Sequence, residues 1–122
     1  MMAAVLADGM TWINNAALEP EVCELACFLK QMGAVIYGDG TKCIRILGGC
    51  TLKDCEYHIM GDRIVAGTYL LGAAGTGGFV EVRGVYHEYL RPILHICEAM
   101  GCKISEDASA ICLKAPECLK SV

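Results

Sequence analysis

The stretch EPEVCELACFLKQMGAVIYGDGTKCIRIL, residues 19–47, contains a complete helix-plus-hairpin unit. Pro20 suits a first helical position, and Gly33 is a natural stop for the helix. Residues 34–37 predict a short strand, residues 38–40 a tight turn and residues 43–47 the return strand. The helix has one apolar face at helical spacing, made of Val22, Leu25, Ala26, Leu29 and Met32.

The same order of signals recurs 68 positions later, so the sequence contains an internal repeat. The second helix ends at Gly101, and Pro92 falls near its start, where we expect a loss of one backbone hydrogen bond at most. A strand, a turn and a return strand are predicted at residues 102–105, 106–109 and 111–113. The apolar face of this helix is made of Leu90, Ile93, Cys97 and Met100.

Each copy is preceded by the end of a helix, a glycine turn and a strand. In the first copy the predicted helix end and strand are residues 3–6 and 11–14, and in the second they are residues 69–74 and 79–85. Gly9 and Gly77 mark the two turns, and Asp62 is a suitable N-cap for a helix from Arg63 to Ala74. No comparable cap precedes the first helix, and the sequence starts at Met1 partway through that helix. We therefore expect this sequence to be an internal piece of a longer protein.

The composition narrows the classes of partner. The chain has 122 residues, of which 55% are hydrophobic and 20% charged, with a net charge of −4. An acidic chain with scattered Lys and Arg does not have the basic surface of a nucleic-acid-binding protein. Its longest apolar stretch, residues 64–75, is too short to span a bilayer. We therefore expect neither nucleic acid nor a membrane as a partner.

Nine cysteines are present, but none forms a C-x-x-C pair. We interpret them as reduced thiols in a cytoplasmic protein, and we expect no metal site and no cofactor. His58, His87 and His95 have no carboxylate or cysteine at ligand spacing along the sequence, so ordinary structural positions are expected for them.

Three stretches resemble the enolpyruvyl transferases, specifically the branch acting on UDP-N-acetylglucosamine. NNAALEPEV (residues 14–22) is similar to that branch's E-N-A-A-x-E-P-E-[IV] turn, and residues 28–48 to its F-L-x-x-[ML]-G-A-x-I-x-G-x-G-T hairpin. GDRIVAGTYLLGAAGTGGFVEV (residues 61–82) is similar to its P-D-R-I-E-[AT]-G-T-[FY]-L segment. The chain departs from the last pattern at Gly61, where the family has proline, and at Val65, where it has an acid.

The resemblance implies an α/β (α+β) fold made of pieces of two inside-out α/β barrels, which are built from βαβαββ units. Residues 1–60 would be the end of the first barrel domain, and residues 61–122 the first repeat unit of the second. Residues 57–62 would be an extended crossover between them.

The resemblance also implies transfer of enolpyruvyl from phosphoenolpyruvate to UDP-N-acetylglucosamine in peptidoglycan precursor synthesis. The family's catalytic groups fall outside the matching segment, so no residue here is assigned a catalytic role and the isolated chain is expected to be inactive. Glu19, Glu21, Asp62 and Arg63 would lie near the cleft between domains, where they would orient the groups that clamp substrate. The alternative for all four is a charged or capped helix N-terminus.

Two other hypotheses remain open. The chain could come from the sister branch that makes 5-enolpyruvylshikimate 3-phosphate, although the Glu19–Glu21 and Asp62–Ile64 stretches favour the amino-sugar branch. It could also be a non-catalytic binding or assembly module built on the βαβαββ unit. For an isolated piece, the two apolar helix faces predict self-association, because each would be left without neighbouring units.

Overall fold

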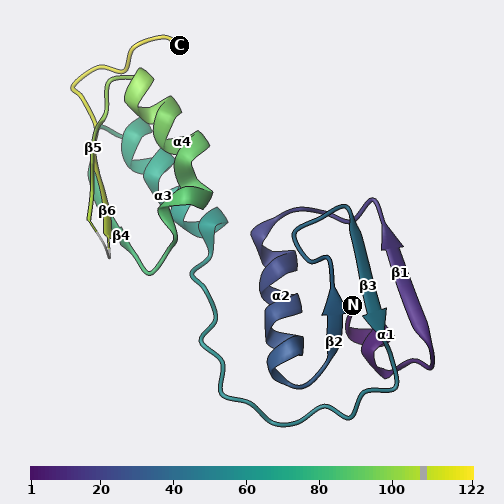
Figure 1. The fold of residues 1–122 in the computed structure, drawn as a ribbon. Helices are drawn as coiled ribbons and strands as arrows, with labels where there is room; N and C mark the ends of the chain where they lie inside the picture. Colours follow the sequence, from purple (N-terminus) through teal and green to yellow (C-terminus); the bar gives the residue numbers. More distant parts are fainter. Residues whose placement is uncertain (108–109) are drawn as a thin grey trace. The chain divides into compact units, whose positions relative to one another are not determined.

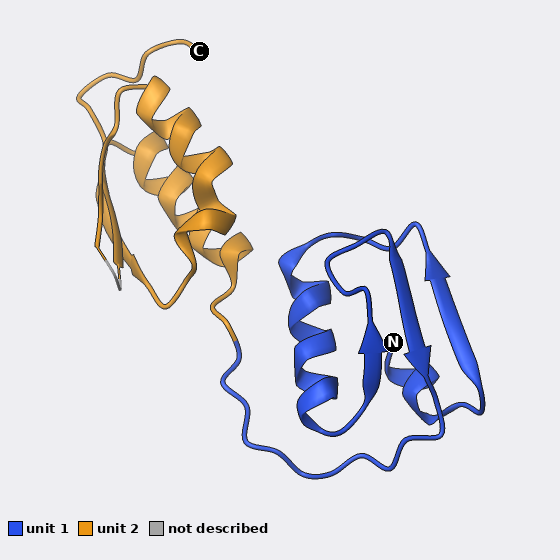
Figure 2. Cartoon of the chain, in the orientation of Figure 1, with its two compact units in different colours: residues 1–59 blue, residues 60–122 orange. Residues whose placement is uncertain are grey.

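The computed structural model describes residues 1–107 and 110–122, and the chain divides into two compact units, Met1–Ile59 and Met60–Val122 (Figure 2). Each unit has its own hydrophobic core. Residues 48–62 contain no helix or strand, and Asp62 is exposed. The boundary between the two units therefore falls inside the predicted crossover, residues 57–62.

In the first unit a short helix and a longer one pack against a three-stranded antiparallel sheet of order β1-β3-β2. The register pairs Met10 with Leu47 and Asn14 with Cys43, while Val35 of β2 also lies opposite Leu47. The core is centred on Ile44 and Ile46 of β3, which are 1% and 0% exposed. The elements are α1 (Met2–Leu6), β1 (Met10–Asn14), α2 (Pro20–Gln31), β2 (Val35–Tyr37) and β3 (Cys43–Leu47).

The second unit repeats this arrangement with a sheet of order β4-β6-β5. Two helices of similar length lie together on one face of that sheet (Figure 1). Leu70 of the first helix and Leu113 of the central strand are fully buried between the layers. The elements are α3 (Arg63–Gly75), β4 (Phe79–Arg83), α4 (His87–Ala99), β5 (Lys103–Glu106) and β6 (Ala110–Lys114). The predicted turn at residues 106–109 starts inside β5, and residues 108–109 lie outside the described part of the chain.

Matching hydrogen bonds close both units, which supports the repeat at atomic detail. After β3 the chain turns back, and the Lys53 N–H donates to the Met32 carbonyl at 2.8 Å. After β6 the Lys120 N–H donates to the Met100 carbonyl at 2.9 Å. Leu52 and Leu119, which precede these lysines, pack against the two cores. The repeat thus extends through a Leu-Lys pair that lies beyond the predicted return strands.

The offset between the copies is not constant. The Gly48 N–H donates to the Gly9 carbonyl, and the equivalent bond runs from the Ala115 N–H to the Gly78 carbonyl. Gly9 therefore corresponds to Gly78, not to Gly77, and the offset of 68 is wrong at this point. The connection from β1 to α2, residues 15–19, is longer than its counterpart from β4 to α4, residues 84–86, and this difference changes the offset along the chain.

Local signals explain the helix ends. Pro20 occupies the first turn of α2, and Gly33 and Gly101 follow α2 and α4 with φ of +104° and +96°, which favours glycine. Pro92 lies inside α4, not near its start as expected. Because proline has no N–H, the helix loses one i→i−4 hydrogen bond there.

The apolar faces of α2 and α4 pack inside their own units, which corrects the reasoning behind the predicted self-association. Leu29 is 4% exposed and Cys97 is 0% exposed, and each belongs to the core of its own unit. The core of the second unit also includes Leu94, which the predicted face omitted. A helix of each unit covers its own sheet, so these faces need no further unit. Along residues 1–107 and 110–122, no helix is long and apolar enough to cross a membrane.

Candidate functional site

The first two predicted site residues lie at the N-terminus of α2. Glu19 is the N-cap residue, with an extended backbone (φ −61°, ψ 144°) and no side-chain cap hydrogen bond. Glu21 lies in the first turn, and both side chains are exposed. Carboxylates here are stabilised by the positive end of the helix dipole. The structure therefore places two carboxylates at this helix start, one on either side of Pro20.

The other two lie at the N-terminus of α3. The Asp62 carboxylate accepts hydrogen bonds from the N–H groups of Ile64 at 2.7 Å and Val65 at 3.0 Å, which confirms it as the N-cap. Arg63 is the first helical residue and is half-buried, and Val65 is 51% exposed. Asp62 is thus fixed in orientation by the helix that it starts. The structure brings Glu19 beside Glu21 and Asp62 beside Arg63, and the sharing of one cleft by the two pairs stays a prediction.

Gly61, the departure from the family pattern just before this cap, is in tight contact with the loop between β4 and α4 of its own unit. A Cβ built on Gly61 would lie 2.1 Å from the Gly84 carbonyl oxygen and 2.7 Å from Cγ1 of Val85. The backbone therefore approaches the loop between β4 and α4 more closely than any side chain would permit. Glycine here permits a packed contact beside the Asp62 cap.

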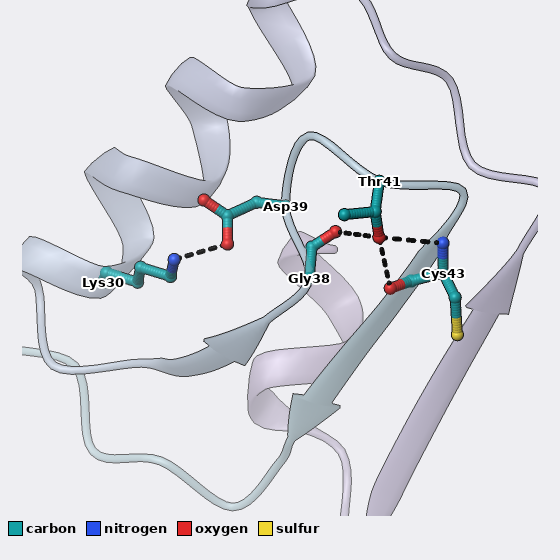
Figure 3. A network of polar contacts seen from close by, with 5 residues as sticks. All are labelled: Lys30, Gly38, Asp39, Thr41 and Cys43. Atoms are coloured by element: carbon teal, nitrogen blue, oxygen red, sulfur yellow. Dashed lines mark hydrogen bonds and ion pairs between the residues drawn. The ribbon is translucent and has the colours of Figure 1, made fainter.

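The hairpin between β2 and β3 carries a network of polar contacts (Figure 3). The Thr41 hydroxyl lies 2.7 Å from the Gly38 carbonyl and 3.1 Å from the Cys43 carbonyl, and it accepts from the Cys43 N–H at 3.3 Å. Because a hydroxyl has one proton, it serves one carbonyl at a time. The threonine of the G-x-G-T pattern thus holds the turn closed.

A salt bridge ties the same turn to α2. The Lys30 ammonium lies 2.5 Å from the Asp39 carboxylate (Figure 3). Hydrogen bonding to Lys30 lowers the pKa of Asp39 below its ordinary value, against the opposing effect of partial burial. No periodicity in the sequence points to this pair, because its members belong to different elements.

Two thiols meet at the end of α4. Cys97 and Cys102 are buried, and the Cys102 N–H donates to the Cys97 carbonyl at 2.9 Å. Burial, and then the neighbouring Cys102, raise the pKa of the Cys97 thiol. Since the thiolate is the nucleophile, this environment suppresses reactivity. Within the described residues, no group of three or more His, Cys, Asp or Glu side chains could hold a metal ion.

His87 has a carboxylate partner that is distant from it along the sequence. Its Nδ1 lies 2.9 Å from Oε2 of Glu106, which comes from the end of β5. The two residues are 19 positions apart, and they meet because α4 starts beside the end of that strand. The contact joins the start of α4 to the end of β5, and spacing along the sequence could not reveal it.

The sequence of the chain is similar to those of several known proteins. A protein 50% identical over 118 residues, 96% of this chain, is UDP-N-acetylglucosamine 1-carboxyvinyltransferase 1 of Legionella pneumophila. Proteins of the same activity name from Dichelobacter nodosus and Caldanaerobacter subterraneus are 46% and 45% identical over the whole chain. The chain spans 23% of the first relative's length and 29% of the length of the other two.

Solved structures agree on the fold. The enolpyruvyl transferase NikO from Streptomyces tendae matches with a TM-score of 0.75 at 20% identity, over 95% of this chain and 28% of its own. EPSP synthase from Acinetobacter baumannii matches with a TM-score of 0.62 at 21% identity, over 99% of this chain and 29% of its own. The family model described as EPSP synthase (3-phosphoshikimate 1-carboxyvinyltransferase) matches residues 1–122. The chain therefore belongs to this enolpyruvyl transferase family.

Proposed function

We propose that the chain is part of an enzyme that transfers enolpyruvyl from phosphoenolpyruvate to UDP-N-acetylglucosamine, a step of peptidoglycan precursor synthesis in the cytoplasm. The observation that carries this proposal is the 45–50% identity to proteins named for that activity. Identity to the solved enolpyruvyl transferases of other names is 20–21%. The difference favours the amino-sugar branch.

The reaction adds a sugar hydroxyl to phosphoenolpyruvate and then expels phosphate. It needs a base for the hydroxyl, an acid for the enol carbon and cations that hold phosphate and carboxylate. In our proposal residues 1–60 end the first barrel domain and residues 61–122 begin the second. Glu19, Glu21, Asp62 and Arg63 would border the cleft and orient the residues that clamp substrate, which is a positioning role.

The isolated chain should be inactive, because the groups that the family uses for catalysis lie outside the segment matched here. We expect no phosphate release above background when the purified chain is mixed with phosphoenolpyruvate and UDP-N-acetylglucosamine. When catalytic residues act together, removal of one or more of them lowers the reaction rate by orders of magnitude. Turnover would show that the active site has been misplaced.

A segment exchange tests the function itself. This chain would replace the corresponding segment of the Dichelobacter nodosus relative, because the match to that protein covers all 122 residues of the chain. The chimera should release phosphate from phosphoenolpyruvate when UDP-N-acetylglucosamine is supplied. A chimera made with the matching segment of NikO, from a more distant enolpyruvyl transferase, is the control for generic fold compatibility. A folded but inactive chimera would count against the proposal.

The family description favours a second candidate, the sister branch that makes 5-enolpyruvylshikimate 3-phosphate. Supplying shikimate 3-phosphate to the same chimera distinguishes the two, because only a residue set from the sister branch would favour that acceptor. The third hypothesis, a non-catalytic assembly module, is favoured if neither acceptor is used and the chimera is folded.

Self-association of the isolated chain also stays a proposal, now on a different surface. Ile64, Val65, Tyr69 and Leu71 of α3 are 45–65% exposed, and a helix that is apolar on all sides is usually buried. Sedimentation should therefore show species larger than a monomer. A compact monomer at high protein concentration would contradict this.

A further inference from the structure

The outer face of the first unit's sheet is unusually apolar for a surface that its own helices do not cover. Strand alternation sends Ile13, Ile36, Ile44 and Ile46 towards the helices, and these pack in the core. The opposite side chains point outward, and four large ones are 42–58% exposed. We call this surface the aromatic face, and it consists of Met10, Trp12, Val35, Tyr37, Arg45 and Leu47.

Arg45 lies at the centre of the aromatic face. The register places it opposite both Trp12 and Tyr37. Its guanidinium carbon is 5.4 Å from the Trp12 ring centroid and 5.9 Å from that of Tyr37. Two cation–π contacts hold the planar group between the rings. In the described chain no carboxylate lies within ion-pair distance of Arg45, so its hydrogen-bonding edge is left for a partner.

The second unit provides an internal comparison, because its sheet has the same order and register. The positions equivalent to Trp12, Val35 and Leu47 are there Glu81, Lys103 and Lys114. These are ordinary solvated charges, and Glu81 pairs with Arg83 of its own strand. The fold therefore does not require apolar residues at these positions. Their presence in only one of two matching units points to a contact made by that unit.

The charge pattern narrows the kind of partner. Trp, Tyr and Arg are the residues that most often dominate protein interfaces. A nucleic acid would need several cations along a track, whereas this face has one in a chain of net charge −4. A second copy docked face to face would bring two Arg45 cations together without a carboxylate between them. A partner protein that presents a carboxylate between apolar side chains satisfies both the cation and the apolar border.

We propose that the aromatic face binds a segment of another protein in which a carboxylate side chain is flanked by apolar residues. The carboxylate receives the outward edge of the Arg45 guanidinium, and the flanking side chains pack on Trp12, Tyr37 and the Met10–Leu47 border. The inference does not depend on the transferase activity. It concerns the outer side of the first unit's sheet, whereas α2 packs on the opposite side of that sheet.

Trp12 is the only tryptophan of the chain, so its fluorescence reports on this surface directly. The probe is acetyl-Val-Ser-Glu-Ser-Val-amide, whose blocked ends carry no charge and whose valines and glutamate share one face when extended. The control peptide has Gln in place of Glu. The full chain is titrated with each peptide into the millimolar range at low and high salt.

We expect the Glu peptide to change Trp12 emission saturably and to bind about tenfold more tightly than the Gln peptide, since charge-assisted hydrogen bonds are the stronger kind. High salt should reduce the difference. Arg45→Met keeps apolar length and should abolish the preference for Glu, whereas Arg45→Lys should keep part of it. Arg83→Ala, on the equivalent face of the second unit, should behave like the unaltered chain. Circular dichroism confirms that each variant is folded.

Several results would overturn the proposal. Equal binding of the two peptides, or no saturable change with the Glu peptide, would remove the role of the cation. Trp12 emission that depends on protein concentration without peptide, and loses that dependence in Arg45→Met, would assign the face to a second copy of the chain. Tighter binding of an oligodeoxythymidylate than of the Glu peptide would assign it to a nucleic acid.

Discussion

Replacing glycine by alanine should have opposite effects at Gly61 and at Gly72, within the same unit. A Cβ on Gly61 would lie 2.1 Å from the Gly84 carbonyl oxygen, and real Cβ contacts essentially never fall below 3.0 Å. The obstructing atom is backbone, so rotation of a side chain cannot relieve the overlap. Gly72 lies in α3, and a Cβ there would meet nothing within 4 Å.

The magnitudes follow from these surroundings. Forcing a methyl group into a filled site costs about 1–3 kcal/mol, so Gly61→Ala should lower the free energy of unfolding by that amount. Alanine is favoured over glycine in a helix interior by roughly 0.8–1 kcal/mol, so Gly72→Ala should raise it. In a domain of this size about 1 kcal/mol shifts the Tm by roughly 4–8 °C.

Far-UV circular dichroism in urea measures the stability, and hydrogen exchange of α3 and β6 peptides assigns the change to the second unit. Fluorescence of Trp12 in the first unit should have the same midpoint in both variants. The reasoning is refuted if Gly61→Ala is as stable as the unaltered chain. It is also refuted if Gly72→Ala is the more damaging change, because a helical position with open space around the new methyl group should gain stability.

Three further predictions follow from the contacts. Asp62→Ala should cost about 1 kcal/mol in urea unfolding of the second unit, while Asp62→Asn, which can still cap α3, should cost much less; equal losses would contradict the cap. Leu113→Ala should destabilise only the second unit and Ile46→Ala only the first, each by about 2–5 kcal/mol, as measured by hydrogen exchange in both units; a change in both units would argue for one shared core. The salt bridge between Lys30 and Asp39 lowers the carboxyl pKa from its ordinary value of 3.8, so its stabilisation is present above that value and is lost as pH falls through the lower folded-state pKa. Asp39→Asn should remove this dependence, at a cost of about 0.2–1 kcal/mol at neutral pH because the pair is partly exposed, and a pH profile identical to that of the unaltered chain would show that the pair contributes nothing.

The sequence alone was sufficient for the elements and their order. Helical spacing, Pro20, Asp62 and the two glycines after α2 and α4 fix where helices start and stop, because these signals act through neighbouring residues. Strand periodicity and a repeated order then predicted two matching units. The family resemblance rested on the same local stretches, and the comparisons confirm it.

Contacts between distant residues were decided by the tertiary structure. Spacing could not reveal that Glu106 contacts His87 or that Lys30 pairs with Asp39. It also could not reveal that the backbone of Gly61 lies against Gly84. The members of each pair belong to different segments of the fold. The same limit explains the wrong expectation for the apolar faces of α2 and α4. A periodic pattern shows that a helix has a face to bury but not which surface covers it.

The aromatic face depends on both kinds of information. The sequence determines which side chains alternate along β1, β2 and β3, since successive residues of a strand point to opposite sides. Only the register of the assembled sheet places Arg45 of the central strand between Trp12 on one edge strand and Tyr37 on the other. Those three residues are separated by long stretches of chain, and cross-strand pairing, which is a property of the folded sheet, brings them together.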